Sequence, residues 1–195
     1  DSRAARDAGQ KTFWVQSFGD AAFAVALLVL YGSYGTWDMT DLLARLQTAP
    51  APLTVWPGLQ WDCDVPLVVT LLLVLSVMTK SAQFPFHFWL IGTIEAPTPV
   101  SALMHAGIVN AGGFLVNRLA PLFGLAPTTL HLMFVIGGIT ALIGATAMLT
   151  QTSVKRRLVY STMGQMGYMV MECGLGAFAL AVFHLCAHGL FKATL

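Results

Sequence analysis

Three titratable side chains lie at equal spacing near the carboxyl end of the sequence: His184, His188 and Lys192. Residues four apart share one face of an α-helix, and each such step rises about 6 Å, so the three groups would form a stripe about 12 Å long. Because histidine titrates near physiological pH, such a stripe with intervening water could pass protons along the helix. The same side chains could instead join helices by hydrogen bonds.

Two further ionisable residues lie in long apolar stretches. Lys80 is the only Lys, Arg, Asp or Glu between Val65 and Ile94, and His105 lies in the uncharged stretch 96–117. Ionisable groups inside a membrane are costly and usually mark a path for ions or protons. A lysine that can be neutral or charged is a proton carrier, although Lys80 could also extend to the membrane surface and His105 could simply bridge two helices.

The composition indicates a membrane environment. Of 195 residues, 56% are hydrophobic and only 10% are charged, and the mean hydropathy is +0.72. A soluble domain carries about 25% charged residues, so a soluble globule is excluded. The net charge of +1 provides no basic surface for nucleic acid. The three cysteines are Cys63, Cys173 and Cys186. They are far apart and form no CxxC motif, which argues against a disulfide scaffold or a zinc ribbon.

Apolar stretches of about 20 residues can cross a bilayer as helices, and the chain contains about six of them. We therefore expect an all-α integral membrane protein, with residues 1–195 forming a single transmembrane domain. The expected helices cover about 12–35, 66–94, 98–119, 128–150, 157–173 and 176–195.

The second expected helix is too long for one straight span and contains Pro85. About 30 residues at 1.5 Å each would reach roughly 45 Å. Proline removes a backbone hydrogen bond and restricts the residue before it, so we expect two half-helices around a break near 80–87. Such breaks are tolerated at membrane depth only where protein or a wet cavity satisfies the backbone, and transporters place ion sites at them. Lys80 lies beside this break.

Basic residues predict the orientation, because Lys and Arg concentrate in cytoplasmic segments. Residues 1–11 and 150–157 are both rich in Lys and Arg, and an even number of expected crossings separates them. We therefore expect both segments in the cytoplasm and the connection 36–64, which carries four aspartates and one arginine, on the outside. The chain lacks a starting methionine and stops within an apolar helix, so we expect an internal fragment of a longer polytopic protein.

A metal or haem site is a weaker interpretation of the same histidines. Cys186 lies between His184 and His188, but helical geometry turns it about 200° away. Two histidines four apart need a further ligand from another helix to hold zinc. Neither CxxCH nor GxGxxG occurs. We expect a transporter subunit without an enzymatic active site of its own, and with no metal or cofactor.

We expect structural or surface roles for the remaining polar residues of the apolar stretches. Asp20 is expected to be buried in the first helix, where it could pair with a lysine. Glu172 lies shortly before turn-forming glycines, so we expect it at the surface. We interpret Arg118 as an anchor at a helix end, His87 as interfacial and His131 as structural.

These motifs resemble the proton-conducting, antiporter-like membrane subunits of respiratory complex I, the family of its subunit 5. The resemblance covers nearly the whole chain and is carried by the segments KSAQFPFH at 80–87, EAPTPVSALMH at 95–105, YSTMGQMGY at 160–168, and 184–192. It implies a counter-ion glutamate upstream of the chain and a second broken helix downstream. The residues to which it assigns proton transfer are Lys80, His105, His184, His188 and Lys192.

Some details resemble one branch of this family, the membrane subunits of the DAB inorganic-carbon pump. These are Glu95-Ala96-Pro97, where complex I subunits commonly have Glu-Gly-Pro, and the stretch 172–178. This resemblance implies ion-coupled uptake of bicarbonate or carbon dioxide, in the bacterial plasma (inner) membrane, with a soluble zinc-containing partner subunit. The alternative is subunit 5 of NADH–quinone oxidoreductase, with other complex I subunits as partners, or a related cation/proton antiporter. The transported ion, H⁺ or Na⁺, stays open.

Overall fold

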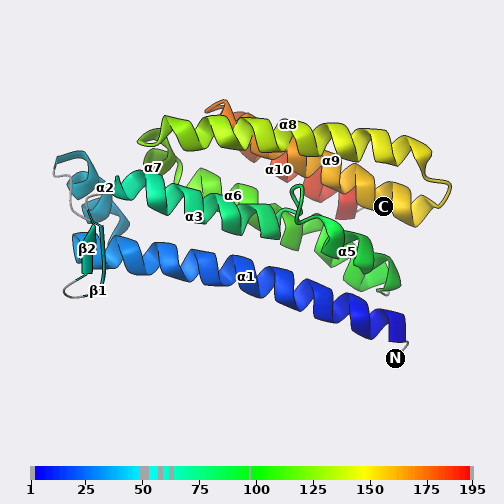
Figure 1. The fold of residues 1–195 in the computed structure, drawn as a ribbon. Helices are drawn as coiled ribbons and strands as arrows, with labels where there is room; N and C mark the ends of the chain where they lie inside the picture. Colours follow the sequence, from blue (N-terminus) through cyan, green and yellow to red (C-terminus); the bar gives the residue numbers. More distant parts are fainter. Residues whose placement is uncertain (1–2, 49–52, 57–58, 62–63, 97, 194–195) are drawn as a thin grey trace.

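The computed structural model describes residues 3–48, 53–56, 59–61, 64–96 and 98–193. Long helices lie side by side with nearly parallel axes, and a short hairpin is attached at one end (Figure 1). The chain begins at the opposite end, where the connection after residue 150 also lies. The two basic segments of the sequence therefore share one end of the bundle, and the acidic connection 36–64 lies at the other.

The first two long helices, α1 (Arg3–Tyr34) and α3 (Val65–Lys80), pack along each other. α1 begins well before the expected residue 12. Gly19 of α1 lies directly against Thr79 of α3, and a Cβ atom at this glycine would collide with the threonine hydroxyl. This close approach brings the next residue of α1 beside the end of α3.

The predicted break in the second helix is confirmed. α3 ends at Lys80, and helical structure resumes only with α4 (Phe88–Gly92) and a 3-10 turn, η1 (Thr93–Glu95). Protein groups satisfy the freed backbone, as a break at membrane depth requires. The N–H of Phe84 donates to Thr140 Oγ1 at 3.0 Å, and the indole of Trp89 donates to the carbonyl of Thr79 at 2.9 Å.

A second break interrupts the helix expected over 98–119, so that expectation was wrong. α5 (Thr98–Ala106) gives way to a 3-10 turn, η2 (Ile108–Asn110), and then to α6 (Ala111–Arg118). The side-chain amide of Asn110 donates to the carbonyl of Ala106 at 2.7 Å. A side chain that satisfies this carbonyl offers the backbone an alternative to the regular helical bond.

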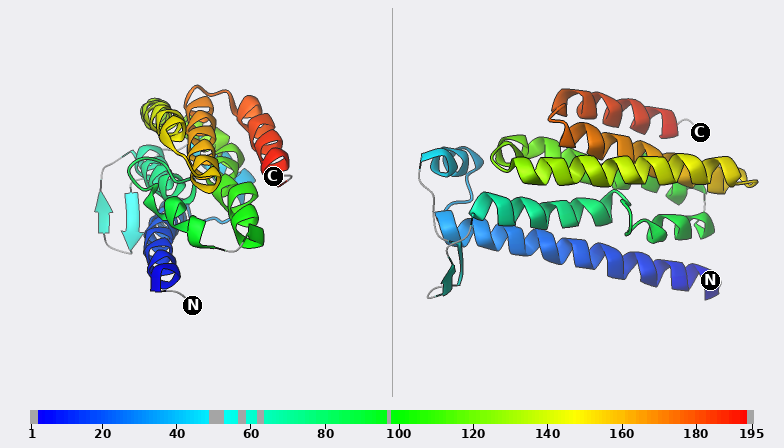
Figure 2. Two further views of the ribbon diagram at one scale, coloured as in Figure 1. Left: turned by 90° about the vertical axis from the view of Figure 1, so that its right-hand side faces the viewer. Right: turned by 45° about the horizontal axis from the view of Figure 1, so that its top comes forward.

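The remaining helices are α7 (Ala120–Gly124), α8 (Pro127–Thr150), α9 (Val154–Gly174) and α10 (Phe178–Ala193). α8 and α9 pack most closely, because glycines of each helix lie against the backbone of the other. These glycines are Gly137, Gly144, Gly167 and Gly174. α10 lies at the edge of the bundle beside α9 and α5, as the end-on view in Figure 2 shows.

The connection 36–64 contains structure that the sequence analysis did not predict. It holds α2 (Met39–Thr48) and an antiparallel pair of strands, β1 (Leu53–Trp56) and β2 (Leu59–Trp61), with Leu53 opposite Trp61. Cys63 lies outside the described residues.

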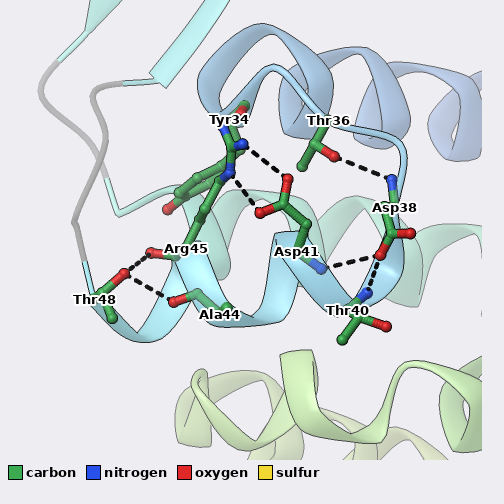
Figure 3. A network of polar contacts seen from close by, with 8 residues as sticks. All are labelled: Tyr34, Thr36, Asp38, Thr40, Asp41, Ala44, Arg45 and Thr48. Atoms are coloured by element: carbon green, nitrogen blue, oxygen red, sulfur yellow. Dashed lines mark hydrogen bonds and ion pairs between the residues drawn. The ribbon is translucent and has the colours of Figure 1, made fainter.

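A small polar network fastens α2 to the end of α1 (Figure 3). Arg45 forms an ion pair with Asp41 at 2.8 Å and donates to the carbonyl of Tyr34 at 2.9 Å. The carboxylate of Asp38 accepts from the N–H of Thr40 at 2.8 Å, which caps the start of α2. The hydrogen bond from Arg45 lowers the pKa of the Asp41 carboxyl below its ordinary value.

Among the described residues, two helices are long and apolar enough to cross a membrane by length and composition: α1 and α8. The apolar helices α3 and α10 are shorter. The breaks near residues 81–87 and 107–110 explain part of this difference, because each divides an apolar stretch into pieces that no longer count as one long helix.

Candidate functional site

Lys80, the last residue of α3, forms an ion pair with Asp20 of α1, with 2.6 Å between Nζ and Oδ1. The expectation that Asp20 pairs with a lysine is therefore confirmed. Asp20 is not buried, however, because 61% of its side chain is exposed, against 24% for Lys80. α1 lies at the edge of the bundle in Figure 1 and packs along α3.

His105 is buried on α5, close to the turn that follows α4. Its Nε2 lies 3.4 Å from the hydroxyl of Thr93, and that hydroxyl donates to the carbonyl of Leu90 at 2.6 Å. Since the hydroxyl proton is already used, the threonine oxygen is left to accept from Nε2–H. A neutral His105 then presents a bare Nδ1, and this atom is buried without a hydrogen-bond partner in the described part of the chain.

His184 is held between two groups of α9. Its Nδ1 lies 3.0 and 3.2 Å from the two carboxylate oxygens of Glu172, and its Nε2 lies 2.8 Å from Oε1 of Gln165. The expectation that Glu172 lies at the surface was wrong. The short connection between α9 and α10 folds the last turn of α9 against the start of α10, so this carboxylate faces the histidine.

His188 and Lys192 continue the stripe along α10, and both are buried. Lys192 donates to the hydroxyl of Ser161 at 3.3 Å. Neither ring nitrogen of His188 has a hydrogen-bond partner among the described residues. These residues line a cavity of about 260 Å³ between α9 and α10, together with Gln165, His184, Ala187 and Phe191. This partly open cavity has room for several waters beside its hydroxyl, amide, imidazole and ammonium groups.

The second helix break lies between Lys80 and this cavity. On one side, the hydroxyl of Ser81 donates to the carbonyl of Val109 at 2.7 Å. On the other side, Gly189 of α10 packs against the break, where an added Cβ would lie 3.3 Å from the carbonyl oxygen of Ala106 and 3.5 Å from the amide nitrogen of Asn110. One layer of unwound backbone therefore separates the end of α3 from α10.

The structure thus groups the predicted residues in two places. His105, His188 and Lys192 lie close enough for the charge of Lys192 to act on both rings. Lys80 pairs with Asp20 on the far side of the 107–110 break.

Sequence reasoning missed several polar residues that contact the predicted ones. They have ordinary side chains and no distinctive spacing, so only their contacts reveal them: Thr93, Ser161 and Gln165.

The other polar residues lie apart from this group. His131 and Arg118 are exposed, and His87 is partly buried at the first break. Cys173 is buried and Cys186 is exposed. Within the described ranges, no three His, Cys, Asp or Glu side chains gather in a way that could hold a metal ion.

An apolar helical bundle with two unwound helices and a line of buried bases is typical of a membrane protein that transfers ions. The comparison with known families agrees with this class. The chain belongs to the family described as NADH:quinone oxidoreductase/Mrp antiporter, transmembrane region, whose sequence profile matches residues 1–195. This finding confirms the predicted resemblance and the membrane and transport character of the chain.

Individual relatives come from more than one branch of the family. The chain is 53% identical over 186 residues to the probable inorganic carbon transporter subunit DabB1 of Halothiobacillus neapolitanus, covering 94% of this chain and 32% of that protein. It is 41% identical over 196 residues to NAD(P)H-quinone oxidoreductase chain 5 of Synechocystis, covering 100% of this chain and 28% of that protein. The chain thus spans about a third of the length of these curated relatives.

A solved structure has the same fold. The Mrp complex from Dietzia contains a chain that superposes with a TM-score of 0.86 at 31% sequence identity. The match covers 98% of this chain and 20% of that one. The mainly helical, antiporter-like architecture is therefore shared with a chain of an Mrp complex.

Proposed function

We propose that this chain is part of a proton-translocating membrane subunit of an energy-coupled inorganic-carbon uptake complex. The observation that carries this proposal is the group of buried bases around the cavity between α9 and α10, with the 107–110 break lying between this group and the end of α3. The carbon-uptake role is supported by the higher identity to the DabB1 protein, 53% against 41% for the Synechocystis oxidoreductase chain.

The proposed topology has about six membrane crossings, of which α10, with 16 residues, is shorter than the roughly 20 residues that a bilayer core requires. They are α1, α3 with α4, α5 with α6, α8, α9 and α10. Residues 1–11 and 150–157 face the cytoplasm, and 36–64 faces the outside. The arrangement in Figure 1 supports this topology, because the two basic segments lie at one end and the acidic connection at the other. For a bacterial protein, the membrane is the plasma (inner) membrane.

In the proposed mechanism, protons pass between Lys80 and the cavity through water beside the unwound backbone at 107–110. A proton that leaves the Lys80 ammonium is accepted by the bare Nδ1 of His105 and moves on to His188 or Lys192. Like charges in a poorly solvated region repel strongly, so His105 and Lys192 are not readily charged together. Arrival of a proton at one therefore favours its release from the other, and the partner subunit biases this exchange.

Replacing Lys80 tests the proposed function. We expect Lys80→Met, made in the complete subunit and expressed with its partners, to abolish proton-coupled transport while the complex still assembles. Lys155→Met is a matched control, because Lys155 is an exposed lysine in the first turn of α9. Full transport by the Lys80→Met protein would refute the role of this residue.

A second candidate is a proton-pumping subunit 5 of NADH–quinone oxidoreductase or a cation/proton antiporter subunit. It is favoured by the match of the entire chain to the Synechocystis protein and by the Dietzia Mrp structure. The partners distinguish the candidates. Co-purification of a soluble zinc protein, with uptake of labelled bicarbonate that depends on this subunit, supports carbon uptake. Co-purification of flavin and iron–sulfur subunits with quinone reduction supports the oxidoreductase instead.

A further inference from the structure

Glu172 lies in the last turn of α9 and faces the first member of the α10 stripe. Its two carboxylate oxygens lie 3.0 and 3.2 Å from Nδ1 of His184. The side chains of Glu172 and His184 are only 16% and 17% exposed. Glu95 and Glu172 are the only acidic residues after Asp64. A carboxylate is costly in an apolar helical bundle, so its placement against a histidine of the stripe calls for a functional account.

Both ring nitrogens of His184 face groups that can accept a hydrogen from them. A carboxylate can only accept hydrogen bonds, and the amide oxygen of Gln165 can also only accept. Nδ1 of His184 therefore carries a hydrogen toward Glu172, whereas the Gln165 amide can face Nε2 with its oxygen or, turned over, with its NH₂ group. When a proton reaches Nε2, the ring becomes an imidazolium, and the Glu172 carboxylate and the Gln165 amide oxygen can both accept from it.

Charges on the neighbouring elements make this pair sensitive to protons in the cavity. His188 and Lys192 follow His184 on α10, and His105 of α5 lies within electrostatic range of both. A proton on any of these groups repels the positive charge of His184. In the described part of the chain, Glu172 is the carboxylate that pairs with this stripe. Its negative charge offsets that repulsion.

We propose that Glu172 is a further proton-transfer residue of this path, paired with His184, at the end of the bundle where α9 joins α10. The inference rests on the proposed function. In the transfer step, His184 takes up a proton from the cavity, and the resulting imidazolium passes its Nδ1 proton to a carboxylate oxygen of Glu172, leaving a neutral imidazole and a neutral carboxylic acid. The acid exchanges its proton with water at this end of the bundle. The ring turns, and it recovers a proton from the cavity through the bare nitrogen.

The position of Glu172 along its helix fits this role. It lies two residues before the end of α9, about 3 Å along the axis, so the carboxyl group is close to the end of the bundle. His184, His188 and Lys192 lead from it along α10 to the cavity. Glu172 therefore extends the stripe toward the surface, where protons can enter or leave.

Substitution of the pair in the complete subunit, assembled with its partners, tests the inference. We expect Glu172→Gln, which keeps the shape and removes the titratable group, to lower transport at least tenfold, and Glu172→Asp to retain most of it. His184→Gln should be equally impaired, and the double variant no worse than either single one. The transport–pH profile of Glu172→Asp should shift, which a merely structural carboxylate would not cause. Cys186→Ser, at an exposed position of α10, is the control.

Chemical labelling of the unmutated complex provides a second measurement that does not depend on folding of a variant. An apolar carbodiimide reacts with protonated carboxyl groups, so we expect label on Glu172 that increases as the pH falls, with a matching loss of transport. Full transport by Glu172→Gln, or no label at Glu172, would overturn this inference. If Lys80→Met is inactive, either of these two results leaves the proposed function intact. An active Lys80→Met variant would instead contradict the proposed function itself.

Discussion

Ser81 and Val109 join the two unwound segments of this bundle through a single hydrogen bond, from the serine hydroxyl to the valine carbonyl at 2.7 Å. Both residues are buried. Gly112 packs against Ser81, and a Cβ atom there would collide with the serine hydroxyl. The breaks therefore support each other: the side chain at one satisfies the backbone that the other leaves free.

Removal of this hydroxyl should destabilise the bundle. In Ser81→Ala, the buried carbonyl of Val109 loses its partner, which costs about 1–3 kcal/mol. We expect a lower thermal midpoint of the purified protein and slower transport, since the two breaks are no longer joined. Ser153→Ala, at an exposed serine before α9, should change neither quantity. An unchanged midpoint in Ser81→Ala would show that another group satisfies the carbonyl.

The Asp20–Lys80 ion pair predicts a defect in transport when the carboxylate is neutralised. In Asp20→Asn, Lys80 loses the negative charge that offsets its own, so we expect a several-fold slower transport rate with normal assembly. The double variant with Lys80→Met should be no worse than Lys80→Met alone. Asp7→Asn, at an exposed position of the same helix, serves as the control. Additive effects of Asp20→Asn and Lys80→Met would contradict a functional pair.

The close packing of α8 and α9 predicts that a single methyl group is destabilising. A Cβ atom at Gly167 would collide with the backbone of Ala141, which cannot move without separating the helices. We expect Gly167→Ala to cost about 1–3 kcal/mol, measured as a lower thermal midpoint. Gly9→Ala is matched in chemistry but has no heavy atom within 4 Å of the added Cβ. It should be neutral or stabilise α1 by about 0.5–1 kcal/mol.

The polar network of α2 predicts a local dependence on acid pH. Arg45 lowers the pKa of Asp41 below 3.8, its ordinary value. A carboxyl whose pKa is lower in the folded state stabilises that state above the ordinary value, and this contribution is lost as the pH falls through the lowered one. We therefore expect α2 to become accessible to an acid-active protease below about pH 4. In Asp41→Asn the accessibility should not depend on pH in this range, and an unchanged dependence would contradict the assignment.

Much of the class and some of the site could be predicted because they depend on neighbours along the chain. Apolar stretches define helices that need a membrane, Pro85 marks a break, and spacing alone places His184, His188 and Lys192 on one face. These features follow from local backbone geometry and from the length of the hydrophobic runs. The structure retains each of them.

Other features depend on residues that are far apart in sequence, and only the tertiary structure decided them. The break at 107–110 contains no proline and depends on contacts with Ser81 and α10. The partner of Glu172 is set by how α10 folds back on α9, and the strand pair in the 36–64 connection by the antiparallel pairing of β1 with β2. The sequence shows which side chains can ionise and how far apart they lie along the chain. Which charge lies beside which base depends on helix packing, because a hydrogen bond or ion pair requires a separation of about 3 Å that spacing along one helix does not specify.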